Sequence, residues 1–443
     1  MRIATVILAG LLALPAAAAA AQQEPAPVAS ATESDVQAFR RLRAEGVAAA
    51  GAQDLPTAAT RLAEADARIP NHPGLILLRA RVAALSGQTD EALAQVRRFA
   101  RLGLVHDLAR DRTLSTLSAA PGFAAAVEAL EANQAPVGAD RLAEVAGIDG
   151  SVIAESLVRD ETRGRWLVSQ VRGRTIVAMA DDGTVSDFLG ADPDTGAILG
   201  MAVDAGSGVL WAATSPLPPA VHGLLADATR PAPALLKIDL ATAAVLARLA
   251  LPAGPPERGP GDIVRAADGT IYVADSLTGD ILVLPSGGSA LGTLLPAGTL
   301  GSPQGMVVTP DGTALIVADY SSGLWRIDRT TGAARRLAAP ADASLIGIDG
   351  LTTDGGVLYG FQNGVAPQRV LTLTLTPDAD WTAIGAVEVL AANLPMIDEP
   401  TTGLVRNREL VFVSRSQWSD FGGDGAQTTP TPAPAIIARL PLD

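Results

Sequence analysis

A repeated unit of turn and short apolar strand constrains this 443-residue chain more than any other feature. Six segments share this mostly apolar composition, and they cover residues 166–171, 210–215, 271–276, 315–320, 358–363 and 411–416. Their first residues lie 44, 61, 44, 43 and 53 positions apart, which is typical of the blades of a β-propeller and not of a helical solenoid. The sequence therefore predicts a mainly β fold, a six-bladed β-propeller.

A second predicted strand follows each of these six strands. These second strands cover residues 174–178, 234–239, 280–284, 323–328, 369–373 and 435–439. Asp-Gly pairs at 182–183, 268–269 and 311–312 precede later strands, where a tight hairpin needs a residue that tolerates positive φ. Residues 141–146 have no partner before the first blade, and we expect them to form the outermost strand of the last blade. Such pairing would close the ring and remove its exposed edges.

Residues 35–134 show helical spacing instead. Ala58 and Ala92 are 34 residues apart, and residues 71–74 (Asn-His-Pro-Gly) mark a break between two units. This spacing resembles that of tetratricopeptide repeats. We expect a small all-α, tetratricopeptide-like domain at 35–134, followed by the propeller at 139–443.

The predicted helical pairs leave two interpretations open. Stacked helix pairs form a concave groove that commonly holds a peptide, so this domain could bind a protein partner. Alternatively it is a helical cap that binds nothing, because two repeats are fewer than an independent solenoid needs. Docking against the propeller would then supply the missing burial. His72 and His106 are predicted to be turn and surface residues.

The N-terminus has the three parts of a secretory signal. Met1-Arg2 gives a basic start, residues 3–14 are apolar, and the alanines up to Ala21 suit cleavage. The alternative, a membrane anchor, needs about 20 apolar residues. We therefore predict a signal peptide at 1–21, a flexible leader at 22–34, a periplasmic or secreted protein, and no membrane association after cleavage.

Composition excludes several classes of function. The chain has no cysteine, so disulfides and thiolate metal sites are excluded. Its net charge of −14 provides no basic face for phosphates, so nucleic acid is not an expected partner. Aromatic residues make up 3% of the chain, which argues against a platform for stacking sugars or bases.

In a propeller, the first residues of the innermost strands converge on the mouth of a central channel. Aligning the blades places one residue of each at this position, namely Glu155, Leu199, Gly261, Gln304, Asp349 and Thr402. Two carboxylates and an amide therefore meet near one axis.

The blade starts at 154–157, 259–263, 302–306 and 348–351 carry a resemblance to a known family. They are similar to those of the senescence-marker-protein/gluconolactonase/luciferin-regenerating-enzyme family, whose relatives include strictosidine-synthase-like and NHL-type propellers. The resemblance covers about residues 141–443. It implies a calcium or zinc ion at the channel mouth and hydrolysis of a lactone or a related ester.

The resemblance also implies roles for single residues. Glu155 matches the glutamate ligand, and Asp349 matches the aspartate that is both ligand and catalytic base. Gln304 stands where an asparagine ligand is expected, and its carbonyl oxygen can also bind a hard cation. Gly261 stands where a substrate-contacting asparagine often occurs. Asp262, the next residue, is a candidate for substrate binding only if the strand register shifts, since it would otherwise face away.

Three alternatives stay open at this point. Glu155 and Asp349 could instead bind backbone amides at blade ends. Residues 396–403 and 414–421 place Glu399, Gln417 and Trp418 on loops of blade six, where polar and aromatic residues often bind substrate; the alternative there is a closing turn with a Trp packed on it. A lone histidine, His222, lies in a proline-rich insertion of blade two that could cover the channel; the alternative for it is a solvated loop residue.

Two functions remain. The first is an exported, gluconolactonase-like propeller that binds a divalent metal and hydrolyses a small lactone or ester. The second is a non-enzymatic periplasmic binding or scaffold protein that uses its helical groove and propeller face for protein partners.

Overall fold

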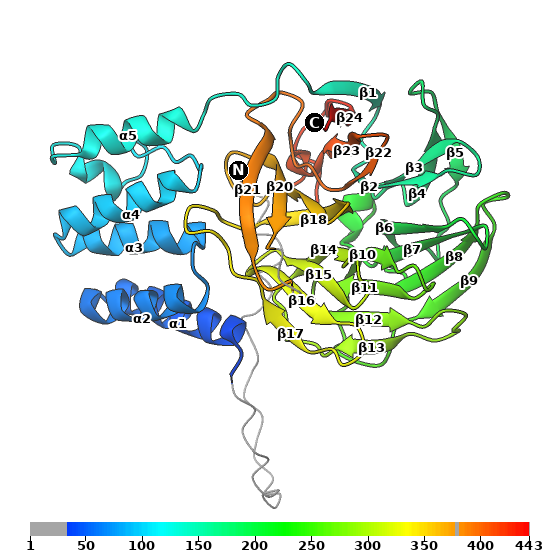
Figure 1. Cartoon of the computed structure of the whole chain (residues 1–443), viewed down its shortest axis with the longest axis horizontal. Helices are drawn as coiled ribbons and strands as arrows, with labels where there is room; N and C mark the ends of the chain where they lie inside the picture. Colours follow the sequence, from blue (N-terminus) through cyan, green and yellow to red (C-terminus); the bar gives the residue numbers. More distant parts are fainter. Residues whose placement is uncertain (1–32, 377–380, 443) are drawn as a thin grey trace, which may run out of the picture.

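The computed structural model describes residues 33–376 and 381–442. A helical unit precedes a propeller (Figure 1). The helices are α1 (Asp35–Gly51), α2 (Leu55–Arg68), α3 (Pro73–Leu85), α4 (Thr89–Arg101), the 3-10 helix η2 (Leu114–Leu117) and α5 (Phe123–Ala132). The predicted signal peptide at 1–21 lies outside the described residues, as does nearly all of the leader. Across 33–376 and 381–442, no helix is long and apolar enough to cross a membrane.

Six four-stranded sheets form the blades. Blade 1 consists of β2 (Ala154–Asp160), β3 (Arg165–Gln170), β4 (Thr175–Met179) and β5 (Val185–Leu189). Blade 2 consists of β6 (Ala197–Asp204), β7 (Val209–Ser215), β8 (Ala234–Asp239) and β9 (Val245–Ala250). Blade 3 consists of β10 (Pro260–Arg265), β11 (Ile271–Asp275), β12 (Asp280–Leu284) and β13 (Gly292–Leu295). Blade 4 consists of β14 (Pro303–Val308), β15 (Ala314–Asp319), β16 (Gly323–Asp328) and β17 (Ala334–Arg336). Blade 5 consists of β18 (Ile348–Asp354), β19 (Val357–Gln362), β20 (Arg369–Leu375) and β21 (Ile384–Ala392). Blade 6 consists of β22 (Gly403–Arg406), β23 (Glu409–Arg415), β24 (Ala435–Pro441) and β1 (Ala143–Ile148).

The predicted ring closure is confirmed. The last sheet has the order β1-β24-β23-β22, so the first strand of the propeller lies beside its last one. The two strands run antiparallel, with Ala143 opposite Arg439 and Ile148 opposite Ala435. The six inner strands contact one another in a closed ring, from β2 through β6, β10, β14 and β18 to β22.

Burial explains why these strands form where the repeat predicts them. In β7, β11 and β15 every residue is buried, because neighbouring blades cover both faces of each sheet. One apolar cluster, for example, joins Val168 and Met179 of blade 1 to Val413 and Ile437 of blade 6. The core of the propeller is therefore a set of apolar layers between blades.

The Asp-Gly turns act as predicted. Gly183, Gly269 and Gly312 have φ values of 85°, 87° and 71°, in the left-handed region that glycine adopts without strain. At Gly183, an added Cβ would also lie 2.4 Å from the carbonyl oxygen of Val145 in β1.

In the helical unit, Ala58 of α2 and Ala92 of α4 are both fully buried, which lets the paired helices pack closely. The histidines differ from the sequence prediction, since neither is simply a surface residue. His72 caps α3 by accepting a hydrogen bond from the Leu75 N–H, and its ring stacks on Phe39. His106 bonds through Nε2 to the Asp111 carboxylate, at 2.9 Å.

The helical unit is docked on blades 4 and 5 through buried polar contacts. The Asn71 side chain donates to the carbonyls of Pro340, Ala341 and Ala343. Arg369 of β20, 4% exposed, donates from Nη1 to the Leu102 carbonyl just after α4, at 3.0 Å. The expected docking is therefore present in the structure.

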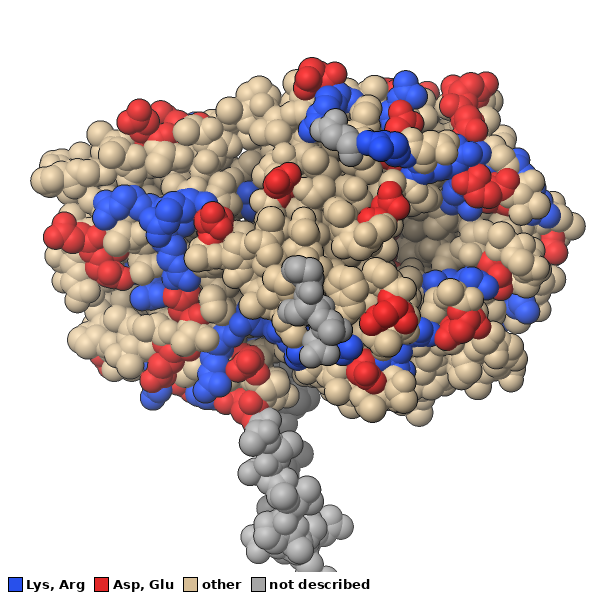
Figure 2. Space-filling view, viewed as in Figure 1, with Lys and Arg blue, Asp and Glu red and all other residues tan. Residues whose placement is uncertain are grey.

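Figure 2 shows acidic and basic side chains mixed on the visible face. Ion pairs of the propeller include Arg406 with Glu161 and Arg248 with Asp192. Exposed pairs of this kind contribute little to stability.

Candidate functional site

The inner strands share an irregularity at their first residues. In the five blades from β2 to β18 the pairing with the next strand shifts register there, as in a β-bulge, between 154 and 157, 198 and 201, 260 and 263, 303 and 306, and 348 and 350. A bulge leaves its residues unpaired and redirects their side chains. The predicted site residues Glu155, Asp262, Gln304 and Asp349 all lie within these bulges.

Close contact between neighbouring inner strands explains the glycines of the bulges. A Cβ added at Gly200 would lie 2.5 Å from the Gly261 oxygen, and one at Gly350 would lie 2.0 Å from the Thr401 oxygen. Blades 1 and 3 depart from this rule, because Ser156 and Asp262 occupy the equivalent positions. Blade 3 shares the register shift of blades 1, 2, 4 and 5, and the Asp262 charge acts on both Glu155 and Asp349.

Glu155 is held by blade 6. The Trp418 indole N–H donates to its Oε2 at 2.6 Å, and the Thr401 hydroxyl donates to its main-chain oxygen at 2.6 Å. Burial raises the pKa of Glu155 to about 8. The Trp418 hydrogen bond opposes this shift, whereas the charges of Asp262 and Glu399 add to it.

Asp349 is held by two residues that sequence reasoning did not place in the site. The Asn363 amide donates to Asp349 Oδ2 at 2.7 Å, and the Tyr320 hydroxyl donates to Asn363 Oδ1 at 3.0 Å. Burial raises the pKa of Asp349 well above its usual range, and the charges of Glu155 and Asp262 raise it further. Tyr320 and Asn363 each follow the second strand of a blade, and that shared position is the signal that could have found them.

Two further acids complete the cluster. Burial raises the pKa of Asp262 to about 7. Burial also raises the pKa of Glu399 to about 7, aided by the neighbouring Asp398 charge. The Glu399 N–H donates to the Gln368 side chain at 2.6 Å, and its φ of 53° fixes it in a turn. Glu155, Asp262, Asp349 and Glu399 are called the acidic cluster below.

The remaining predicted residues have different surroundings. Gln304 is partly exposed and donates from Nε2 to the Ser302 hydroxyl at 3.2 Å. Gln417 is fully buried, and its amide accepts from the N–H groups of Val152 and Ile153 and donates to two carbonyls. Its polar atoms therefore fasten the blade-6 loop to blade 1, and we leave Gln417 out of the proposed site.

Structural carboxylates of the propeller behave differently from the acidic cluster. Asp275 and Asp319, which end β11 and β15, are fully buried and accept hydrogen bonds from main-chain N–H groups, such as Gly259 and Ser321. Asp275 is also paired with Arg258 at 2.9 Å. Glu155, in contrast, is held by a side chain of blade 6 and Asp349 by the side chain of Asn363 in its own blade, and both are partly exposed.

The cluster offers oxygen donors, which suit a hard cation such as calcium better than zinc. Within the described ranges, no three His, Cys, Asp or Glu side chains are grouped closely enough to hold a metal ion. A cation bound by Glu155 and Asp349 therefore needs a neutral oxygen as a further ligand, and Gln304 lies in the neighbouring bulge of β14.

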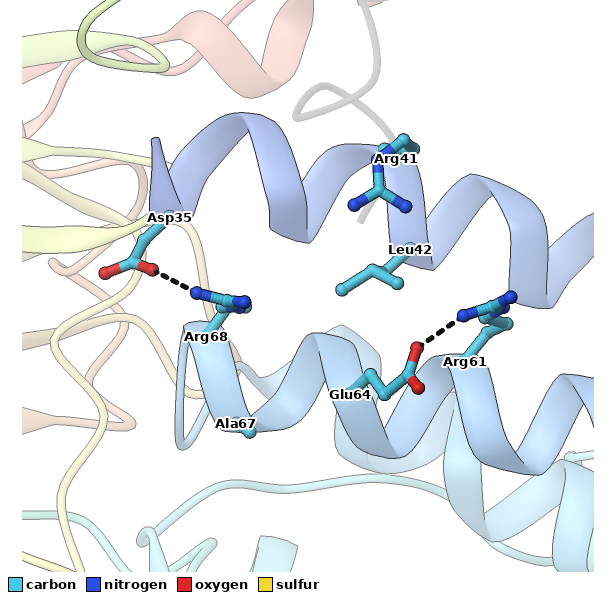
Figure 3. Close-up of a pocket in the computed structure, with 7 residues that line it drawn as sticks. All are labelled: Asp35, Arg41, Leu42, Arg61, Glu64, Ala67 and Arg68. Carbon is cyan, nitrogen blue, oxygen red and sulfur yellow. Dashed lines mark hydrogen bonds and ion pairs between the residues drawn. The ribbon is translucent and has the colours of Figure 1, made fainter. Parts of the chain in front are cut away.

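A hollow between α1 and α2 is a second candidate location (Figure 3). Charged side chains line it, but they are paired with one another. Arg68 contacts Asp35 at 3.2 Å, and Arg61 contacts Glu64 at 2.8 Å. These pairs are exposed and satisfied, so the hollow presents no group that calls for a ligand.

Comparison with known proteins finds no matching family model and no match among curated proteins. Similar solved structures include a gluconolactonase from Xanthomonas campestris, with 19% identity over 69% of this chain and 91% of that one and a TM-score of 0.46. A luciferin-regenerating enzyme gives 13% identity, 69% and 95% coverage and a TM-score of 0.47. Regucalcin from Agrobacterium tumefaciens, a calcium-binding protein, has 16% identity over 66% of this chain and 92% of that one, with a TM-score of 0.44. The six-bladed fold itself stands on this chain's own strand order.

Proposed function

We propose that this protein binds a divalent cation at the channel mouth through Glu155, Asp349 and the Gln304 carbonyl, and hydrolyses a lactone or related ester there. The observation that carries the proposal is the acidic cluster. Its four carboxylates come from separate blades and loops, they repel one another, and no arginine or lysine lowers the pKa of Glu155, Asp262 or Asp349 within the described residues. Such charge concentration is costly without a cation or protons to compensate it.

Each group at the channel mouth has its own role in the proposed hydrolysis. A bound cation would polarise the ester carbonyl and acidify water. Asp349 accepts a proton as water attacks the carbonyl carbon. The ring C–O bond then breaks, and the leaving oxygen takes up that proton to give an open hydroxy acid. Asn363 and Tyr320 keep Asp349 in place.

The test starts with the metal content of the purified protein. The melting temperature should rise on adding calcium to protein stripped of metal, because the ion binds only the folded state. Glu155→Gln and Asp349→Asn should each abolish that rise and the cation-dependent release of acid from a lactone panel. Asp187→Asn, an exposed carboxylate on β5, is the matched control and should change neither. Stability that ignores calcium, zinc and magnesium alike would rule the proposal out.

We also propose that the protein is exported. Support comes from the basic, apolar and small-residue segments at 1–21 and from the absence of cysteine. N-terminal sequencing of the mature protein from a periplasmic fraction tests this. A mature chain that still begins at Met1 would contradict it.

A further inference from the structure

Two insertions from distant parts of the sequence pack together beside the acidic cluster. One lies between β7 and β8 and contains the 3-10 helix η3 (Pro219–His222), and the other lies between β23 and β24 and contains η4 (Trp418–Asp420). Their apolar side chains form one cluster with blade 1 and blade 2. Its buried members are Ile153, Val171, Ala197, Val221 and Phe421.

Arg172 fastens the two insertions to blade 1. Its Nη1 donates to the Val221 carbonyl at 2.8 Å, and its guanidinium lies over the Phe421 ring at 5.5 Å. His222 bonds through Nδ1 to the Arg172 carbonyl at 3.1 Å, so it is a structural residue and not a solvated one. Both insertions are therefore held against blade 1 through Arg172.

Three partly buried apolar side chains pack on this cluster, namely Leu199, Leu217 and Trp418. We call them the apolar wall. Leu199 occupies in β6 the bulge position that Glu155 occupies in β2. Trp418 donates its indole N–H to Glu155, which places the wall directly beside a proposed cation ligand.

The opposite side of the mouth is polar. Blades 3 to 5 contribute Asp262, Gln304 and Asp349, with Asn363 behind Asp349. A ligand at the mouth therefore meets hydrogen-bonding groups on one side and hydrocarbon on the other. A fully hydroxylated sugar lactone would place hydroxyls against leucine, where they lose their water without a replacement partner.

We infer that the substrate is a lactone with an apolar substituent, which packs against Leu199, Leu217 and Trp418 while the ester faces Glu155 and Asp349. This inference rests on the proposed function, because it identifies the substrate class of the same site. Leu199 and Leu217 are then residues that determine specificity.

The first experiment compares three lactones on the calcium-loaded, full-length mature protein. They are an unsubstituted five-membered lactone, the same ring with a hexyl chain, and a polyhydroxylated six-membered lactone. The hexyl lactone should have a KM about tenfold or more below that of the unsubstituted ring, since several methylenes leave water. Leu199→Asn, which keeps the branched shape but loses apolar character, should remove most of this advantage.

A second experiment reads binding without turnover. The lactam analogues, in which a ring N–H replaces the ring oxygen, resist hydrolysis, so calorimetry gives their affinity with and without calcium. The hexyl lactam should bind about tenfold more tightly than the unsubstituted lactam, and Leu199→Asn should reduce that ratio. Leu199→Met should retain it.

Control variants separate the wall from general effects. Leu224→Asn changes a leucine of the blade-2 insertion that is 44% exposed and outside the wall, and it should leave both ratios unchanged. Leu217→Asn gives a second test if Leu199→Asn lowers the melting temperature.

The outcomes distinguish this inference from the proposed function. Hydrolysis that favours the polyhydroxylated lactone and ignores Leu199 would overturn the inference and keep the function. Tight binding of the hexyl lactam without hydrolysis of any lactone would keep the apolar subsite and reject the hydrolase. Equal affinity for both lactams overturns the inference in either case.

Discussion

Trp418 is the residue that links the apolar wall to the acidic cluster. Its ring packs on the cluster of the two insertions, and its N–H fixes one oxygen of Glu155. Groups that orient a metal ligand in this way commonly change metal affinity by one to two orders of magnitude when they are lost.

Trp418→Phe should keep the ring packing but release Glu155. We expect calcium affinity to fall about tenfold, measured by calorimetry on metal-stripped protein. The matched control is Trp381→Phe, which removes a bond of 3.4 Å from another indole N–H to an exposed carboxylate, Asp311. Equal affinities for Trp418→Phe and the unchanged protein would show that Glu155 needs no such support.

His72 gives a pH prediction away from the site. Burial, together with the Arg43 charge, lowers the pKa of His72 from 6.5 to about 4. The unfolded chain therefore binds a proton below pH 6.5 that the folded chain binds only near pH 4. Stability contributed by neutral His72 is complete above pH 6.5 and is lost as pH falls toward 4, by about 3 kcal/mol.

His72→Asn should flatten this part of the pH dependence, because asparagine caps a helix as well and does not titrate. Urea unfolding at pH 7.5, 6, 5 and 4 gives the difference between variant and unchanged protein. The comparison variant is His222→Asn, because burial also lowers the pKa of His222. A difference that does not vary with pH would contradict the assignment.

At the scale of elements, the sequence predicted the strands that are buried on both faces. Predicted and observed bounds of β7, β8, β11, β12 and β16 differ by at most one residue. The outer strands of blades 1 to 5 were not predicted. For example, β9 is mostly exposed and β17 has only three residues, none of them buried, so both carry little apolar pattern. The closeness of Asp262 to Glu155 and Asp349 depends on how neighbouring inner strands meet. The part played by Gln417 depends on residues 150–153, more than 260 positions earlier, and local patterns do not report such contacts.

Removing strand β1 tests how much ring closure stabilises the propeller. A chain of residues 149–443 lacks β1 and exposes the β24 edge, whereas residues 139–443 keep it. Both chains lack the helical unit, so their difference isolates the strand. We expect the shorter chain to unfold at lower urea and to aggregate, because an unpaired edge pairs with other chains. Identical unfolding midpoints and light scattering would show that β1 adds nothing to the ring.

At the scale of the whole molecule, Arg369 joins the two units. It is almost fully buried, and burial lowers its pKa to about 10. Its Nε donates to Gln362 at 2.7 Å, and its Nη1 donates to the carbonyls of Leu102 and Gly103, which follow α4. A cation at a helix C-terminus is favourable, so this contact caps the helix from the propeller.

Arg369→Met keeps much of the apolar stem but leaves those carbonyls without a donor. We expect a loss of about 2 to 4 kcal/mol and a calorimetric trace that separates into two transitions, with early protease cleavage between residues 102 and 139. The propeller transition should keep its calcium dependence, because the hydrogen bonds of Arg369 go to Gln362, Leu102 and Gly103 and not to the proposed ligands. Arg439→Met, at an arginine whose side chain is 53% exposed, should leave a single transition. One cooperative transition in Arg369→Met as well would mean that the apolar contacts of the helices alone hold the units together.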